Sequence, residues 1–220
     1  MLALVNVANN RLVGPALYVP LSMAAAGLLV LLARRWVGCT WDDLGLDRER
    51  FGSGLRWGGV LLGIMVVVLA AGVALPATRG LFEDDRVRGL GGPAVLYAAF
   101  VRVTLGTVLL EEVAFRGVLP AVLATHLRRR WAIGAAAVLF GLWHILPSLG
   151  MNEVNPVADD TVGRFPQWVT VIGAVASTTA FGIWFSFLRE RSGSLLAPML
   201  AHWSSNALGY LFAYAVLTWS

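Results

Sequence analysis

Lysine is absent from this chain of 220 residues, and all 17 of its basic residues are arginine. Charged residues of either sign are also scarce, at 14%, whereas soluble domains carry about 25%. The arginines are scattered along the chain, which argues against a nucleic-acid partner. With 58% hydrophobic residues and a mean hydropathy of +0.72, the composition predicts an integral membrane protein throughout.

Cysteine is almost absent too. The single Cys39 excludes an intrachain disulfide and a metal cluster held by several thiolates. The first 11 residues lack the basic region and the cleavage site of a signal peptide. We therefore expect the first transmembrane helix itself to direct insertion.

Long apolar runs are what the chain does contain. Since about 20 apolar residues cross a bilayer as a helix, we expect an all-α, polytopic membrane helix bundle with about six to eight transmembrane helices. The third run is too long for one straight span, and we expect it to break near Gly117 or Pro120, because proline removes a backbone donor. All 220 residues are interpreted as one integral-membrane domain, with a motif-bearing core at about 93–217. The predicted spans are 12–33, 57–77, 93–127, 131–146, 166–188 and 195–219.

Arginines at the ends of the spans predict the orientation. Cytoplasmic ends of membrane proteins are enriched in arginine, whereas the loops around Asp84 and Asp159 are acidic and should face outward. Six crossings would leave both termini outside. The expected location is the cell membrane, most simply the plasma membrane of a bacterium. The ends expected in the cytoplasm carry Arg34 and Arg35, Arg48 to Arg56, Arg128 to Arg130, and Arg189 and Arg191.

Three short motifs place polar residues inside the predicted spans. Ionisable groups at membrane depth are costly and are retained mainly where they pair with one another or line a wet cavity. Three such motifs on three different helices outline an active site. They are Glu111-Glu112-x-x-x-Arg116, Phe140-x-x-x-His144 and His202-x-x-x-Asn206.

Helical geometry separates the two glutamates. Glu112 and Arg116 are four residues apart, lie on one face and are expected to form an ion pair. Glu111 is rotated by about 100° from Glu112 and is free to point into the bundle. Glu112 and Arg116 are therefore predicted to support the site, and Glu111 to act in it. The alternative is one solvated cluster of all three side chains at a helix end.

A carboxylate and a histidine from separate helices can activate a water molecule, as Glu111 and His144 would here, with Phe140 on the same face as His144. His202 and Asn206, on consecutive turns of one face, can stabilise the oxyanion formed when that water attacks a carbonyl. Each motif alone has a structural alternative, since polar groups often only bridge membrane helices. Glu111, His144 and His202 are also candidate ligands of a divalent metal such as Zn²⁺. The residues leave the metal-dependent and metal-free mechanisms equally open.

At these residues the chain resembles the CAAX protease and bacteriocin-processing (CPBP) family, also called ABI, whose relatives include the Ras-converting CAAX endopeptidase. All three family motifs occur in order, and the resemblance covers roughly residues 96–211. It implies an all-helical intramembrane endopeptidase with a cavity open to the membrane and the cytoplasm. By similarity Glu111 and His144 would activate water, and His202 with Asn206 would form the oxyanion site. The larger members have eight spans.

The expected function is hydrolysis of a peptide bond near the membrane surface. The expected partners are membrane lipid and a peptide or lipidated-peptide substrate. Family members have been classed as metalloproteases, and a metal-free glutamate mechanism has also been proposed. We favour Glu111 as the base without a tightly bound metal. The alternative of another class is a non-catalytic immunity or scaffold protein, in which the same motifs only hold helices together.

Overall fold

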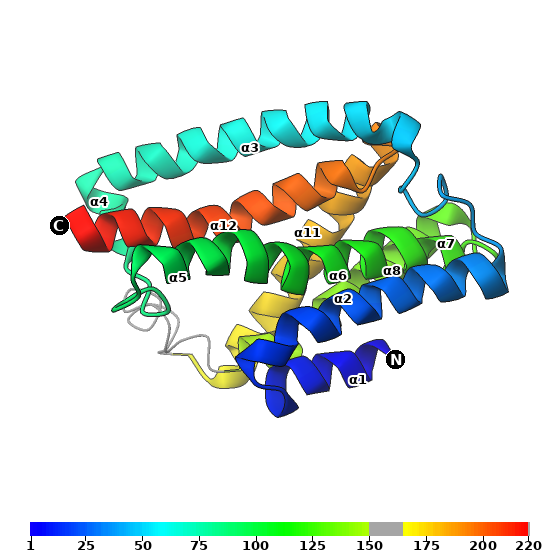
Figure 1. Ribbon diagram of the computed structural model, residues 1–220, viewed down its shortest axis with the longest axis horizontal. Coiled ribbons are helices and arrows are strands. Elements are labelled where there is room, and N and C mark those ends of the chain that lie inside the picture. Colours follow the sequence, from blue (N-terminus) through cyan, green and yellow to red (C-terminus); the bar gives the residue numbers. More distant parts are fainter. Residues whose placement is uncertain (150–164, 220) are drawn as a thin grey trace.

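The computed structural model describes residues 1–149 and 165–219. Every regular element among these residues is a helix, and the long helices lie side by side as a bundle (Figure 1). The predicted all-α membrane bundle is therefore confirmed. The acidic loop predicted around Asp159 lies outside the described residues.

Five helices are long and apolar enough to cross a membrane, so the chain is a multi-pass membrane protein. A sixth long helix, α12 (Leu196–Trp219), has 24 residues. It falls short of the same hydropathy because His202, Asn206 and neighbouring serines interrupt its apolar sequence. The five spans are Pro15–Val37, Arg48–Ala74, Gly92–Leu123, Arg129–Ser148 and Gln167–Ser192.

The span Gly92–Leu123 remains helical along its whole length, so the predicted break near Gly117 or Pro120 is wrong. Leu119, directly before the proline, has helical φ and ψ angles of −58° and −49°. The turns before it are π-helical, with hydrogen bonds between residues five apart, and this wider winding accommodates Pro120 without ending the helix. The segments of this span are α5 (Gly92–Tyr97), the π-helical η5 (Ala98–Val108), α6 (Leu109–Glu112), the π-helical η6 (Val113–Val118) and α7 (Leu119–Leu123).

Helix α12 packs along α3 (Phe51–Ala74) on one side and along η5 on the other (Figure 1). The α3 helix begins after a short turn, Arg48–Arg50, and is followed by α4 (Pro76–Arg79) and a 3₁₀ turn, Gly80–Phe82. Only 6% of the most apolar stretch of the α3 span is buried, so this helix exposes its side chains to lipid. Gly58 allows the approach of α12, because a Cβ there would lie 2.7 Å from the Leu200 side chain.

Helix α8 (Arg129–Trp143) packs against α11 (Gln167–Ser192) and is continued by α9 (Ile145–Ser148). Gly141 faces this contact, and a Cβ there would collide with Thr179 and lie 2.7 Å from the carbonyl oxygen of Val175. Small residues at such positions let membrane helices approach closely. The α8–α11 contact thereby fixes the turn that carries Phe140 and His144.

A short N-terminal helix, absent from the predicted elements, lies beside the first span (Figure 1). It consists of α1 (Leu2–Val7) and a π-helical turn, Ala8–Leu12, and it precedes α2 (Pro15–Leu32), which ends in a further π-helical turn, Ala33–Val37. Asn6 is buried and donates from Nδ2 to the carbonyl oxygen of Trp143, 2.8 Å away. This contact ties the start of the chain to the helix that bears His144.

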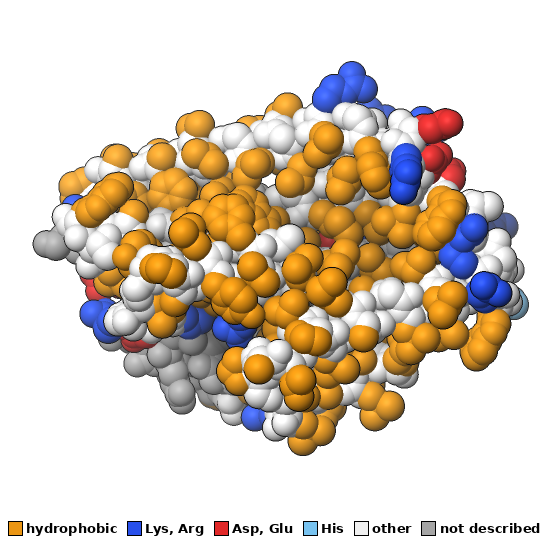
Figure 2. Space-filling model, in the orientation of Figure 1, with side chains coloured by type: hydrophobic (Ala, Val, Ile, Leu, Met, Phe, Trp, Pro, Cys, Tyr) orange, Lys and Arg blue, Asp and Glu red, His pale blue; other side chains and the backbone are white. Residues whose placement is uncertain are grey.

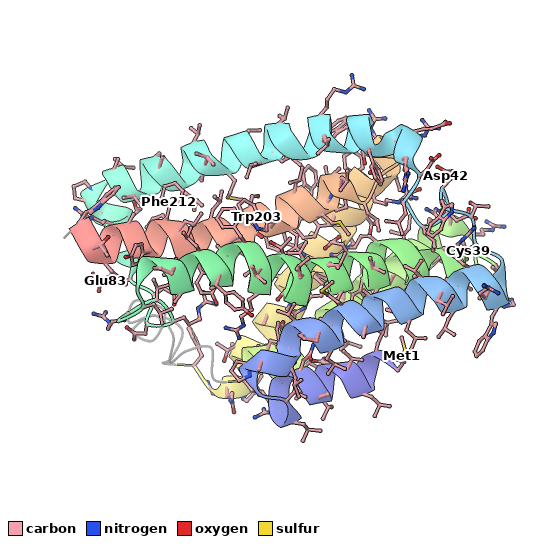
Figure 3. All side chains as sticks on the ribbon, in the orientation of Figure 1. Met1, Cys39, Asp42, Glu83, Trp203 and Phe212 are labelled. Carbon is pink, nitrogen blue, oxygen red and sulfur yellow. The ribbon has the colours of Figure 1, made fainter. Side chains whose placement is uncertain are left out.

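Charged side chains gather toward the two ends of the bundle, and hydrophobic side chains cover most of the face in view (Figure 2). Asp42 and Glu83 lie at opposite ends (Figure 3). Arg50, Arg129 and Arg191, from three different loops or helix ends, line one pocket at the Asp42 end. The fold thus collects the arginines of separate span ends on one side, and the orientation of that side in the membrane stays a prediction.

Candidate active site

Glu111 lies on α6 in the middle of the bundle and is only 6% exposed. Its Oε1 accepts a hydrogen bond of 3.0 Å from the indole nitrogen of Trp143. Its Oε2 is buried and has no hydrogen-bond partner among the described residues. The Nε2 atoms of His144 and His202 each lie 3.9 Å from this oxygen. One carboxylate oxygen is therefore fixed, and the other faces two imidazole rings.

Glu112 is fully buried and holds two other side chains of the site. Its Oε1 lies 2.8 Å from Nδ1 of His202 and 3.1 Å from Nη1 of Arg116. The contact with Arg116 is an ion pair without the geometry of a hydrogen bond. The guanidinium carbon of Arg116 also lies 3.8 Å from the ring centre of Phe140, a cation–π contact. The expected pairing of Glu112 with Arg116 is present, and Glu112 additionally orients His202.

Both histidines have one ring nitrogen occupied and the other directed at Glu111. Nδ1 of His144 lies 2.8 Å from the carbonyl oxygen of Phe140, which can only accept, so this nitrogen carries the proton. His202 is stacked on Phe185, at 5.3 Å between ring centres, while its Nδ1 faces Glu112. These contacts fix the ring orientations and leave Nε2 of each histidine for chemistry near Glu111.

A cavity of about 430 Å³ reaches this cluster. Glu111, His144 and Asn206 are among the side chains on its wall, together with Asn10 and Arg102. The structure thus brings Glu111, His144 and His202 together, and it places Asn206 on the cavity wall, one turn along α12 from His202. Because polar side chains make up part of its lining, the cavity can hold water next to the Glu111 carboxylate.

The donor set of Glu111, His144 and His202 is chemically suited to zinc, but its spacing is not. Ligand distances of about 2.0–2.2 Å would place two ligand atoms of a tetrahedral site roughly 3.4 Å apart. Both separations from Glu111 Oε2 are 3.9 Å. Among the residues the structure describes, no group of three histidine, cysteine or acidic side chains is placed to hold a metal ion. In this arrangement the three side chains are spaced too widely for the tetrahedral zinc site described above.

Trp143 is the residue that the sequence motifs missed. It precedes His144 and reads as one more apolar aromatic residue, yet its indole N–H is the donor that holds Glu111. The available signal is general, since a buried tryptophan at membrane depth needs an acceptor for its N–H. Its own carbonyl oxygen is held by Asn6, from a segment with no recognisable motif.

Comparison with known proteins gives one family. The model of the family described as type II CAAX prenyl endopeptidase Rce1-like matches residues 93–208, which is over half of the chain and includes all three motifs. No curated protein and no solved structure matches the chain.

Proposed function

Because the chain belongs to the type II CAAX prenyl endopeptidase Rce1-like family, a family of proteases, we propose that it is an intramembrane endopeptidase with Glu111 as its general base. The observation that carries this proposal is the buried Oε2 of Glu111, which has no hydrogen-bond partner among the described residues and faces Nε2 of two histidines. A buried carboxylate oxygen left without a donor is costly, and such groups concentrate where chemistry needs them.

In the proposed reaction, Glu111 accepts a proton from water as the water oxygen attacks the carbonyl carbon of the scissile peptide bond. Nε2 of His144 orients this water as a hydrogen-bond acceptor. Nε2 of His202, when protonated, and the side-chain amide of Asn206 donate to the developing oxyanion. The carbon–nitrogen bond then breaks, and the proton held by Glu111 passes to the leaving amine.

The substrate we propose is a peptide or lipidated peptide that reaches the site from the membrane. An apolar groove of about 410 Å³ lies between η5 and α12 and supports this proposal. It is lined by Leu109, two residues before Glu111, and by Trp203, which follows His202. A lipid chain in this groove would lie against the two helices that carry Glu111 and His202. The proposed location is the cell membrane.

The test is peptide cleavage by purified protein in lipid, using fluorogenic peptides with and without an attached lipid chain. Glu111→Gln keeps the size of the side chain but removes its basicity, and it should lower kcat by about 10³-fold, in the range for loss of a general base. Glu49→Gln, a change of an exposed glutamate in the loop before α3, is the matched control and should leave cleavage unchanged.

Wild-type cleavage by folded Glu111→Gln protein would sink the proposal and favour a non-catalytic scaffold. His144→Ala should also reduce cleavage strongly. A separate experiment tests the role of a metal by adding a chelator and then Zn²⁺ to the cleavage assay. Cleavage that is lost on chelation and restored by Zn²⁺ would establish a metalloprotease and replace the metal-free mechanism.

A further inference from the structure

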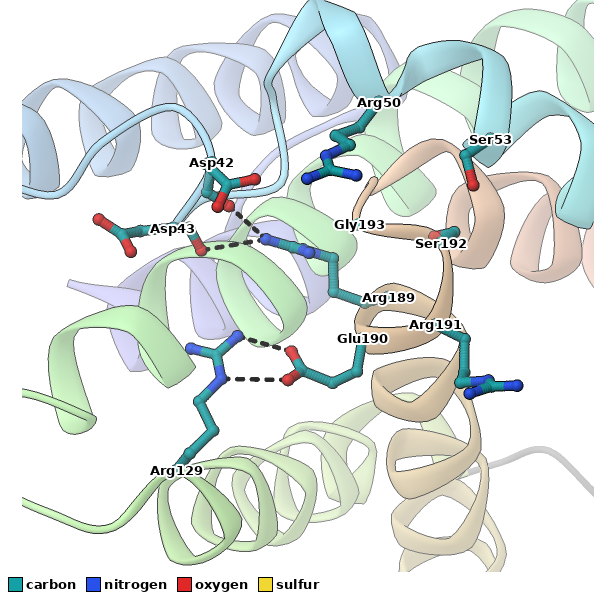
Figure 4. Close-up of a pocket in the computed structure, with 10 residues that line it drawn as sticks. All are labelled: Asp42, Asp43, Arg50, Ser53, Arg129, Arg189, Glu190, Arg191, Ser192 and Gly193. Carbon is teal, nitrogen blue, oxygen red and sulfur yellow. Dashed lines mark hydrogen bonds and ion pairs between the residues drawn. The ribbon is translucent and has the colours of Figure 1, made fainter.

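A second charged pocket, lined by none of the motif residues, lies at the arginine-rich end of the bundle (Figure 4). Its volume is about 510 Å³. The loop after the first span forms one side, and the start of α3, the start of α8 and the end of α11 form the rest. Four separate segments therefore meet around one polar opening.

Two of the three acidic side chains of this pocket already form hydrogen bonds with neighbouring residues. The Asp43 carboxylate accepts from the backbone N–H and the hydroxyl of Thr40, both at 2.7 Å. These bonds lower the pKa of Asp43 and keep its charge within its own turn. Glu190 is bound by two nitrogens of Arg129, at 2.6 and 3.2 Å. Only the Asp42 carboxylate has no such bond among the described residues.

Arg189 contributes a buried positive charge that no carboxylate pairs with. Its residue is 6% exposed, and its Nη2 donates to the backbone carbonyl oxygens of Asp42, at 2.5 Å, and of Asp43, at 3.3 Å. No ion pair to Arg189 occurs within the described part of the chain. Its side chain crosses directly over Gly45, where any Cβ would collide with it. A buried, fixed guanidinium without a counterion favours an anion beside it.

Arg50 adds a second guanidinium, which extends over the opening near Asp42 (Figure 4). It makes no hydrogen bond or ion pair with any residue that the structure describes. Its side chain lies along the end of α11, where a Cβ on Gly193 would be 3.2 Å from its Cδ. Ser53, in the first turn of α3, also lines the pocket. The positive dipole end of this 24-residue helix adds to the attraction for anions.

The position of the pocket indicates where the anion comes from. The arginine-rich end is the one that faces the cytoplasm under the positive-inside rule, and the pocket lies where the spans leave the membrane. Phospholipid phosphates lie at this level, and basic pockets between membrane helices suit anionic headgroups. We propose that this pocket binds the phosphate of one anionic phospholipid, through Arg50, Arg189 and the first turn of α3.

The test measures lipid binding rather than cleavage, so it is independent of the proposed function. The full-length protein is prepared in nanodiscs of phosphatidylcholine with increasing phosphatidylglycerol, and lipid-dependent thermal stabilisation is recorded. Arg50→Gln should weaken the apparent affinity for phosphatidylglycerol by about tenfold, the effect of one charge-assisted hydrogen bond. Arg35→Gln, an exposed arginine near the same end but outside the pocket, removes the same charge and should have little effect.

Three results would overturn the proposal. Equal losses in Arg50→Gln and Arg35→Gln would mean unspecific attraction between arginines and an anionic bilayer. Equal stabilisation by phosphatidylcholine alone would exclude an anionic headgroup. Stabilisation by inorganic phosphate in phosphatidylcholine nanodiscs, as strong as that by phosphatidylglycerol, would replace the lipid with a soluble phosphate. Loss of selectivity for phosphatidylglycerol in Ser53→Ala would support the involvement of the first turn of α3.

Discussion

The charged cluster at membrane depth and the charged pocket at the arginine-rich end use similar residues under opposite conditions. In the deep cluster, the side chains of Arg116 and Glu112 are 1% and 0% exposed. In the pocket, those of Arg129 and Glu190 are both 39% exposed, although their separation of 2.6 Å is the shorter one. Distance alone would rank the exposed pair as the one that matters more for stability, whereas burial ranks the deep pair first.

The two ion pairs differ in what solvates one charge when its partner is removed. At the exposed pair, water solvates either charge, so the pair adds little to stability. The Arg116–Glu112 pair has almost no exposed surface, so removal of one charge leaves the other desolvated. The deep cluster is therefore rigid and its members depend on one another, whereas the pocket can exchange partners and bind an external anion.

The largest effect should come from breaking the deep pair. Arg116→Met keeps the length of the side chain but leaves the Glu112 carboxylate without its counterion, and it should lower the free energy of unfolding by about 3–5 kcal/mol. Arg102→Met, on the same span but without a carboxylate partner among the described residues, is the control. Unfolding in one fixed detergent measures both. A similar loss in the two variants would contradict the idea that charge pairing distinguishes Arg116.

A smaller effect is expected from loosening the deep cluster without removing a charge. Trp143→Phe deletes the N–H donor to Glu111 but retains a ring to pack on Phe115. It should reduce kcat by about tenfold with KM nearly unchanged, the loss of one hydrogen bond to a charged group.

The control for this variant is Trp184→Phe, which removes an indole N–H on the exposed face of α11 but keeps a ring to stack on Phe187. Its kcat should stay closer to that of the wild type. If both tryptophan variants lose kcat equally, the Trp143 hydrogen bond has no special role in holding Glu111.

The smallest effect should come from the exposed pair. In a double-mutant cycle of Arg129→Gln and Glu190→Gln, the coupling free energy should be below about 1 kcal/mol. It should shrink further in 1 M salt, because the Debye length is then about 3 Å. A coupling comparable to that of Arg116 with Glu112 would remove the contrast between the two regions.

Much of the fold was predictable from local sequence. Span positions follow from apolar runs, and the structure has a long helix at each of the six predicted places. The expected break near Pro120 was wrong because a proline effect depends on how the preceding turns are wound, and the π-helical turn Val113–Val118 absorbs it. The N-terminal helix was missed because its short, mildly apolar sequence is ordered by tertiary contacts such as Asn6 to Trp143.

The candidate site, too, was predictable only in part from the sequence. The spacing of four residues on one helix predicted the approach of Glu112 to Arg116, and the rotation of about 100° between adjacent residues predicted the separate direction of Glu111. Spacing on one helix could not predict contacts between helices. The contacts of Glu112 with His202 and of Trp143 with Glu111 each join residues more than 30 positions apart. The catalytic roles of Glu111, His144, His202 and Asn206 stay predictions until cleavage is measured.

By itself, the sequence determined that this chain is a helical membrane protein with polar motifs at membrane depth, because hydropathy and helical periodicity are local properties. Only the tertiary structure decided which oxygen of Glu111 is held and which faces the histidines. It also decided that Arg189 is buried without a carboxylate partner among the described residues. Both outcomes depend on packing between distant helices, where burial removes water and leaves each charge to whichever partner the fold brings near.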